Sequence, residues 1–325
     1  MKILVAIYSP FSSWCIPDVW LQRVRECFPE HTFAVATNDE EALAAIGDAD
    51  VAFGARINPQ QFAAATRLKW IHSHAAGVGG MLFPALVDSG VILTNSRGLS
   101  AGSIAEHTIM VTLALLRGLP RAFDCQRERR WAQDDFVDVI RTLSGARMLI
   151  VGLGAIGSEL ARLAAALGAS VTGIRRRVGA EAPSGVERVA GPQELAGELA
   201  RADIVVVAAP QTSETWHLIG ARELALMKAD AVLVNVSRGN LVDEAALIEA
   251  LDSGRLRGAA LDVFEHEPLD PDSPIWGRDD VIVTPHVAGF FANYWRDVVD
   301  LFSDNLRRFE AGQPLRNVVD KAAGY

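Results

Sequence analysis

Residues 148–167 read MLIVGLGAIGSELARLAAAL, a stretch with the pattern of a strand, a turn and a helix. Its first four residues form an apolar run typical of a buried strand, and from Ser158 onward the apolar residues recur with helical spacing. Gly152, Gly154 and Gly157 stand between them with the spacing GxGxxG. In such a unit the first glycine makes the tight turn, the second lets a pyrophosphate approach the backbone, and the third lets the helix pack on the strand.

This glycine turn predicts an anion site. The free N–H groups and the dipole at a helix N-terminus favour negative charge, so the phosphates of a dinucleotide would bind there. The alternative is an ordinary strand-to-helix turn that binds nothing. Because the glycines stand between a strand and a helix, we predict dinucleotide binding by Gly152, Gly154, Ala155, Ile156 and Gly157.

Short apolar runs on both sides of this unit alternate with helical or turn-like stretches, which is typical of parallel α/β sheets. One series of predicted strands covers residues 3–7, 33–36, 51–53, 70–73 and 91–93. A second series covers residues 147–151, 170–174, 204–208, 231–235, 259–261 and 281–284. The alternation predicts an α/β protein with two doubly wound parallel sheets, in two consecutive domains.

Three further segments have distinct patterns. Residues 100–119 carry apolar side chains on nearly every face of a predicted helix, which indicates burial in a core or between subunits. A last helix is predicted over about residues 292–310. The Gly- and Pro-rich stretch 180–192 is predicted to be a loop.

The composition argues against several classes of function. At 325 residues the chain exceeds what one hydrophobic core usually supports, which favours two domains. A net charge of −9 repels nucleic-acid phosphates, and the arginines within 127–130 are too few to outweigh it.

The three cysteines lack CxxC spacing, which argues against a disulfide framework or a metal site and fits a reducing cytoplasm. Glu106, His107 and Arg117 interrupt the longest apolar run, so we expect no membrane helix.

Three polar residues follow predicted strands of the second series. Arg238 lies in Val-Asn-Val-Ser-Arg-Gly, Glu267 in Leu-Asp-Val-Phe-Glu-His-Glu-Pro, and His286 ends Val-Ile-Val-Thr-Pro-His. The carboxyl ends of parallel strands meet at one edge of a sheet, so these side chains can converge on one crevice. Each residue alone could equally be a surface arginine, a solvated acid or a capped histidine.

Their combination matches what the reduction of a 2-oxo acid needs. An arginine can bind the carboxylate and polarise the ketone through its planar fork, and a histidine can supply the proton. A carboxylate on the other imidazole nitrogen fixes the tautomer and favours the protonated ring. We therefore predict hydride exchange between a nicotinamide cofactor and a small 2-oxo or 2-hydroxy acid.

The residues after the predicted strand 170–174 bear on the choice of cofactor. NAD-specific folds place an Asp or Glu about 20 residues beyond the glycines to bind the ribose hydroxyls. This chain has Arg175, Arg176 and Arg177 there, with no acid nearby. Guanidinium groups bind phosphate well, so we predict that Arg175 and Arg176, supported by Arg177, bind the 2′-phosphate of NADP(H). NAD(H) stays possible, because an arginine cluster can also be a solvated loop.

These residues resemble the D-isomer-specific 2-hydroxyacid dehydrogenase family, over nearly the whole chain. The resemblance is carried by Gly-Leu-Gly-Ala-Ile-Gly, Asn-Val-Ser-Arg-Gly, Gly-Ala-Ala-Leu-Asp-Val-Phe-Glu-His-Glu-Pro-Leu, Thr-Pro-His and the closing Asn-Leu-Arg-Arg-Phe and Asn-Val-Val-Asp. It implies that Arg238, Glu267 and His286 are the catalytic triad and that Asp262 lies by the nicotinamide carboxamide. It also implies that the cofactor is lined by Pro210, Val236 and Ser237. The arginine-rich turn resembles that of NADPH-dependent glyoxylate and hydroxypyruvate reductases.

A substrate loop is implied by the same resemblance. His72-Ser-His-Ala-Ala-Gly-Val-Gly is similar to the family loop whose backbone N–H groups, here those of Ala76 and Gly77, bind the substrate carboxylate together with Arg238 and His286. Small residues suit such an approach, although they also suit a flexible turn. Family members often have an aspartate where Gly79 stands. Three further residues are expected to border the substrate: His74, Trp131 and Trp295.

The resemblance also changes the expected domain order. It implies a flavodoxin-like substrate domain formed by residues 1–98 and 288–325, with a Rossmann NAD(P)-binding domain, residues 99–287, inserted into it. The helix at 100–119 would contribute to a homodimer interface.

Two rival functions stay open at this point. One is a nucleotide-sensing binding protein, like the corepressors that share this fold, which would bind cofactor with little turnover. The other is an enzyme acting on formate or phosphite. Formate-oxidising relatives have glutamine at the triad glutamate, so Glu267 argues against that second rival.

Overall fold

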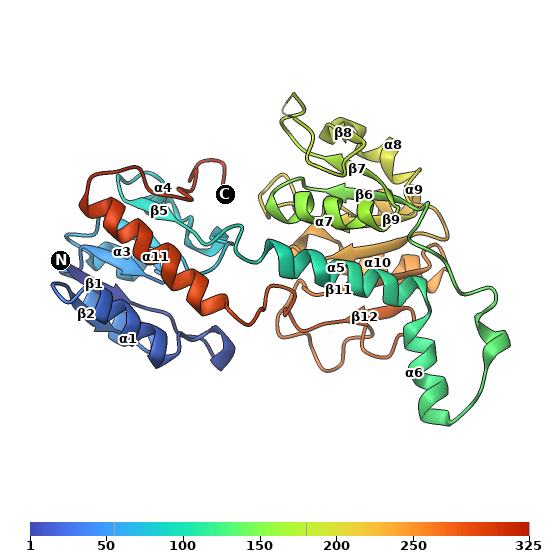
Figure 1. The fold of residues 1–325 in the computed structure, drawn as a ribbon, viewed down its shortest axis with the longest axis horizontal. Helices are drawn as coiled ribbons and strands as arrows, with labels where there is room; N and C mark the ends of the chain where they lie inside the picture. The colour runs from blue at the N-terminus through green and yellow to red at the C-terminus, as the bar shows by residue number, and fades with distance from the viewer. Residues whose placement is uncertain (55, 180, 325) are drawn as a thin grey trace. The chain divides into compact units, whose positions relative to one another are not determined.

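The computed structural model describes residues 1–54, 56–179 and 181–324. The chain separates into two compact units, the first formed by Met1–Leu99 and Phe291–Tyr325 and the second by Ser100–Phe290 (Figure 1). These boundaries lie one and three residues from the expected 98/99 and 287/288. Each unit contains a parallel sheet with helices on both faces, which confirms the predicted α/β fold class.

The described part of the first unit contains a five-stranded parallel sheet with the order β2-β1-β3-β4-β5. Its strands are β1 (Lys2–Val5), β2 (Thr32–Val35), β3 (Val51–Phe53), β4 (Trp70–His72) and β5 (Ile92–Thr94). One face is covered by α1 (Asp18–Cys27) and α11 (Tyr294–Glu310). The other is covered by α2 (Asp39–Ile46), α3 (Pro59–Ala64) and α4 (Pro84–Val87).

The described strands of the second unit form a seven-stranded parallel sheet with the order β12-β11-β10-β9-β6-β7-β8. They are β6 (Arg147–Val151), β7 (Ser170–Ile174), β8 (Arg188–Ala190), β9 (Ile204–Val207), β10 (Val232–Asn235), β11 (Gly258–Leu261) and β12 (Val281–Val283). The central strands β9, β10 and β11 are buried along their whole length and mostly apolar, because helices cover both of their faces.

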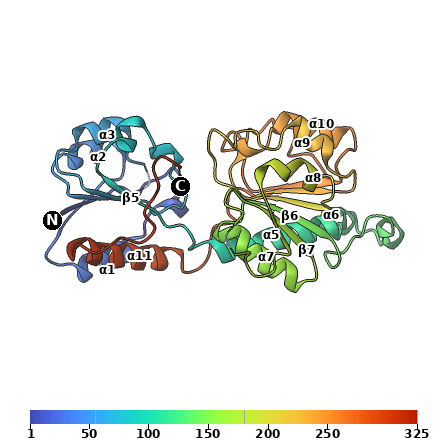
Figure 2. The ribbon, with the colours of Figure 1, turned by 90° about the horizontal axis from the view of Figure 1, so that it is seen from above.

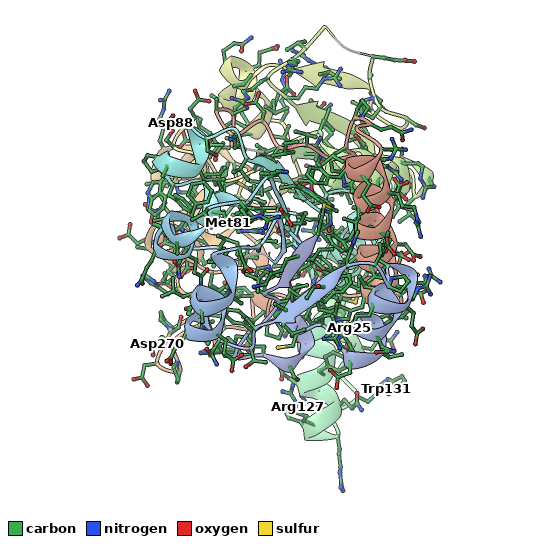
Figure 3. All side chains as sticks on the ribbon, turned by 90° about the vertical axis from the view of Figure 1, so that its left-hand side faces the viewer. Arg25, Met81, Asp88, Arg127, Trp131 and Asp270 are labelled. Atoms are coloured by element: carbon green, nitrogen blue, oxygen red, sulfur yellow. The ribbon has the colours of Figure 1, made fainter. Side chains whose placement is uncertain are left out.

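The helices of the second unit form two layers (Figure 2). One face of the sheet packs against α5 (Ala101–Leu116) and α7 (Ala155–Ala166). The other packs against α8 (Leu195–Leu199), α9 (Ala221–Leu226) and α10 (Glu244–Asp252). A further helix, α6 (Leu119–Glu128), projects away from the sheet with the segment that follows it. Arg127 and Trp131 lie on this projection (Figure 3).

Three sequence predictions about local structure are corrected. The loop expected at 180–192 contains β8, a short edge strand that pairs with β7. Its sequence, Arg-Val-Ala, is too short to show the alternation of a strand. The helix expected at 100–119 ends earlier, at Leu116. Its Met110 is 54% exposed in the single chain, so burial of that face between subunits stays a prediction. α7 begins at Ala155 rather than at Ser158, and Gly154 is its N-cap residue. No helix in the described ranges is long and apolar enough to cross a membrane.

Candidate active site

The glycine turn joins β6 to α7 with geometry that only glycine allows at two of its three positions. Gly152 has a φ of +111°, and a Cβ there would lie 2.5 Å from the backbone nitrogen of Ala209. A Cβ on Gly157 would lie 2.0 Å from the carbonyl oxygen of Gly152. At Gly154, by contrast, a Cβ would meet no described atom within 4 Å, and Gly154 and Ala155 are exposed. The turn therefore presents an open helix N-terminus, which fits the pyrophosphate of a dinucleotide.

The arginine cluster follows β7 directly. Arg175 is partly buried, and its Nη2 donates a hydrogen bond of 2.9 Å to the carbonyl oxygen of Glu181. Arg176 is exposed, and its Nη1 lies 3.4 Å from Oε2 of Glu214. Glu214 belongs to the loop after β9, which begins near the exposed Pro210. Sequence reasoning missed this carboxylate because it lies 38 residues further along the chain.

Arg238 follows β10 on a turn fixed by its neighbours. The Asn235 side chain accepts a hydrogen bond from the Ser237 N–H at 3.1 Å and donates one to the Arg238 carbonyl at 3.0 Å. A Cβ on Gly239 would lie 1.8 Å from the carbonyl carbon of Phe264, so glycine is required where this turn packs against the chain after β11. Burial lowers the pKa of Arg238 and the nearby Glu267 carboxylate opposes that shift, so the guanidinium stays charged. Val236 and Ser237 are buried beside it.

Glu267 and His286 form a close pair. Oε2 of Glu267 lies 2.7 Å from Nδ1 of His286, and Oε1 accepts the Phe264 N–H at 3.1 Å. The two side chains are 36% and 37% exposed, so a small molecule can reach them. The carboxylate faces Nδ1, and Nε2 lies on the opposite side of the ring. The structure thus brings Glu267 and His286 together at the edge of the sheet where Arg238 also lies.

The segment that carries His286 is held by Asp262. His286 has a φ of +53°, which is strained for a residue other than glycine, and its N–H donates to the Asp262 carbonyl at 2.9 Å. The Asp262 carboxylate accepts hydrogen bonds from the N–H groups of Val287 and Ala288, both at 3.0 Å, and from Oγ1 of Thr284 at 2.6 Å. Sequence reasoning expected Asp262 beside the cofactor and missed its bonds to this segment.

The expected substrate loop lies in the first unit. Ala76 and Gly77 are exposed, and Nδ2 of Asn95 donates to the Ala76 carbonyl at 2.7 Å. Within the described ranges, no acceptor takes the N–H of Ala76 or Gly77. A Cβ on Gly79 would meet no described atom within 4 Å, so the loop has room for a side chain at this position.

The residues expected to border the substrate, His74, Trp131 and Trp295, differ in how far they are buried. His74 is buried, and its ring stacks on Trp295 at 5.5 Å between ring centres. Burial lowers the pKa of His74 to about 4, aided by the charge of Arg56. Trp131 is 92% exposed and, among the described residues, makes no hydrogen bond or ring contact with the triad.

Comparison with known proteins places the chain among dehydrogenases. Residues 109–288 match the family model described as D-isomer specific 2-hydroxyacid dehydrogenase, NAD binding domain. The chain is 30% identical over 327 residues to a glyoxylate reductase of Thermococcus gammatolerans, covering 96% of this chain and 95% of that protein. It is 33% identical over 303 residues to a D-3-phosphoglycerate dehydrogenase of Methanocaldococcus jannaschii, covering 92% of this chain. The chain spans 57% of that longer relative's length.

Two solved structures are similar along the whole chain. An NADPH-dependent glyoxylate/hydroxypyruvate reductase from Sinorhizobium meliloti, in complex with NADP and sulfate, is 29% identical with a TM-score of 0.86 and full coverage of both chains. A D-isomer specific 2-hydroxyacid dehydrogenase from Xanthobacter autotrophicus Py2, in complex with NADPH and MES, is 33% identical with a TM-score of 0.85 and 99% coverage of both.

Proposed function

Because the chain belongs to the D-isomer specific 2-hydroxyacid dehydrogenase family, we propose that it uses NADPH to reduce a small 2-oxo acid, of the glyoxylate or hydroxypyruvate type. The observation that carries this proposal is the contact of 2.7 Å between Glu267 and His286 at the sheet edge that also carries Arg238. An anion anchor, a proton donor and a group that orients the donor are what the reduction requires.

The cofactor would be held by the second unit. The open N-terminus of α7 at Gly154 and Ala155 receives the pyrophosphate, and Arg175 and Arg176 bind the 2′-phosphate. Pro210, Val236, Ser237 and Asp262 line the remaining length in this proposal. When bound, the nicotinamide supplies the hydride that the chain's own residues cannot provide.

The roles of the triad follow from its charges and contacts. Arg238 binds the substrate carboxylate through its planar guanidinium and polarises the neighbouring ketone, both more strongly because it is largely removed from water. His286 gives the proton on Nε2 to the oxygen that develops negative charge. Glu267 contacts Nδ1 and fixes the orientation of the ring. The N–H groups of Ala76 and Gly77 are the proposed substrate-binding groups of the first unit.

We propose that the chain forms a homodimer. The proposed compartment is the cytoplasm. The surface around α5 and α6 supports the dimer, because it exposes the apolar side chains of Met110, Phe123, Trp131 and Val137. Sedimentation of the purified chain tests the assembly. A monomer at micromolar concentration would contradict it, and in a dimer we expect Trp131→Ser to favour dissociation.

An initial-rate screen tests the reaction. Glyoxylate, hydroxypyruvate, pyruvate and bulkier 2-oxo acids are reduced with NADPH and with NADH, and D-3-phosphoglycerate is offered in the oxidising direction. We expect the highest kcat/KM for a small 2-oxo acid with NADPH. Fastest turnover of D-3-phosphoglycerate, or NADPH binding without turnover of any acid, would contradict the proposal.

A further inference from the structure

His107 lies on α5, outside the triad, and reaches the ends of two neighbouring strands. The helix packs against β10 and β11, and the side chain of His107 is only 12% exposed. Its Nε2 is 3.1 Å from Oγ1 of Thr284, the residue after β12, and 3.8 Å from Oδ1 of Asp262, the residue after β11. The imidazole therefore contacts the group of residues that holds the His286 segment.

Counting protons fixes the direction of these hydrogen bonds. Both oxygens of the Asp262 carboxylate, 3% exposed, accept backbone N–H groups, so the hydroxyl of Thr284 donates its single proton to Oδ1 at 2.6 Å. Oγ1 of Thr284 is then an acceptor toward His107, whose Nε2 must carry a proton. Burial lowers the pKa of His107 and the charge of Asp262 opposes that shift, with a net decrease that favours the neutral ring. A neutral imidazole has one N–H, so Nδ1 is left without a proton.

We propose that His107 is a positioning residue: its neutral, Nε2-protonated imidazole directs the Thr284 hydroxyl onto Asp262, which holds Val287 and Ala288 and thereby the turn at His286. The proposal rests on the proposed function, because its effect on rate requires His286 to act on the substrate. The turn needs support of this kind because the left-handed backbone at His286 is strained. Without the imidazole donor, the hydroxyl can turn away and the His286 ring loses its fixed position. Small misplacements of a reacting group reduce rates strongly.

Paired variants separate hydrogen bonding from simple space filling. His107→Leu and Thr284→Val keep the volume and remove the polar atoms, whereas His107→Gln and Thr284→Ser can keep a donor and a hydroxyl. We expect kcat to fall about 10- to 100-fold in the first pair and to stay within about threefold of the parent in the second. The double variant His107→Leu/Thr284→Val should be no slower than the slower single variant, because both break the same chain of bonds. Full kcat in Thr284→Val, or equal losses in His107→Leu and His107→Gln, would overturn the proposal.

A spectroscopic readout tests the protonation state without any activity. In the full chain with ¹⁵N-labelled histidine rings, the signals that disappear in His107→Gln are those of His107. We expect them to show a proton on Nε2 and none on Nδ1 at neutral pH. A ring protonated on Nδ1, or on both nitrogens, would overturn the proposal. If no 2-oxo acid is turned over, the proposed function fails while this experiment still decides the state of His107.

Discussion

Glu267 and His286 lie 2.7 Å apart, Oε2 to Nδ1, although they follow different strands of the sheet. The contact orients the pair, with the carboxylate on the Nδ1 side of the ring and Nε2 on the opposite side. Burial alone would raise the pKa of Glu267, but the hydrogen bond and charge of His286 outweigh it, and the pKa lies below its ordinary value. The carboxylate is therefore ionised at neutral pH.

Glu267→Gln should move the pH profile of reduction. The attraction to His286 that lowers the pKa of Glu267 is lost when the carboxylate becomes an amide. Reduction consumes a proton, so the rate falls as pH rises, and we expect this fall to begin at lower pH in the variant. The measurement is kcat/KM against pH, with Glu249→Gln as the exposed control. A profile that matches the parent would show that Glu267 does not act on His286.

Arg238→Ala should remove productive substrate binding. Two charge-assisted hydrogen bonds, each about 1.5 to 3 kcal/mol, correspond to a fall in kcat/KM of about 10²- to 10⁴-fold. Arg238→Lys keeps a charge but loses the planar fork, and should recover only part of the loss. Arg255→Ala, an exposed arginine of the same unit, is the control. Near-normal efficiency of Arg238→Ala would exclude this arginine as the anchor.

His286→Gln should lower kcat by about 10²- to 10⁴-fold, because a general acid acts on the chemical step. The affinity for NADPH, measured by fluorescence titration, should change little. The nearby exposed His266→Gln is the control and should behave like the parent. A collapse of NADPH binding in His286→Gln would instead indicate a structural role.

Arg175→Asp/Arg176→Ala should reverse the cofactor preference. Two guanidinium bonds to the 2′-phosphate allow a preference for NADPH of about 10²- to 10⁴-fold in the parent. The aspartate repels the phosphate and can bind the ribose hydroxyls of NADH. The ratio of kcat/KM with NADPH and NADH measures the effect. A parent that favours NADH, or a ratio that stays unchanged in the variant, would contradict the assignment.

Glu214→Gln should strengthen NADPH binding. Glu214 lies 3.4 Å from Arg176 in an exposed ion pair, so its charge competes with a phosphate for the same guanidinium. Exposed pairs contribute at most about 1 kcal/mol, which predicts a decrease in the NADPH Kd of about 2- to 5-fold and little change for NADH. Glu249→Gln removes an exposed carboxylate on α10 as the control. Equal changes for both cofactors would contradict the competition.

The sequence predicted those features of the fold that arise from residues close together in the chain. The glycine spacing at 152–157 and the apolar runs identified β6, α7 and the central strands, and the family resemblance is confirmed. Pairings between distant segments were not predictable, because nothing near Arg176 indicates Glu214 and nothing near Asp262 indicates His107. The sequence also did not tell which face of α5 packs on the sheet and which, at Met110, is exposed in the single chain, since an apolar side chain does not reveal what covers it.

The insertion of the second unit into the first has a consequence during synthesis. The core of the first unit includes Phe302 of α11, whose ring stacks on Phe53 of β3 at 4.1 Å between ring centres. On the ribosome, residues 1–99 emerge early but lack this helix, while residues 100–290 can fold as they appear. The part of the β1, β3 and β4 face that α11 covers therefore stays open until residues 294–310 have been made, although α1 can pack on the rest of this face earlier.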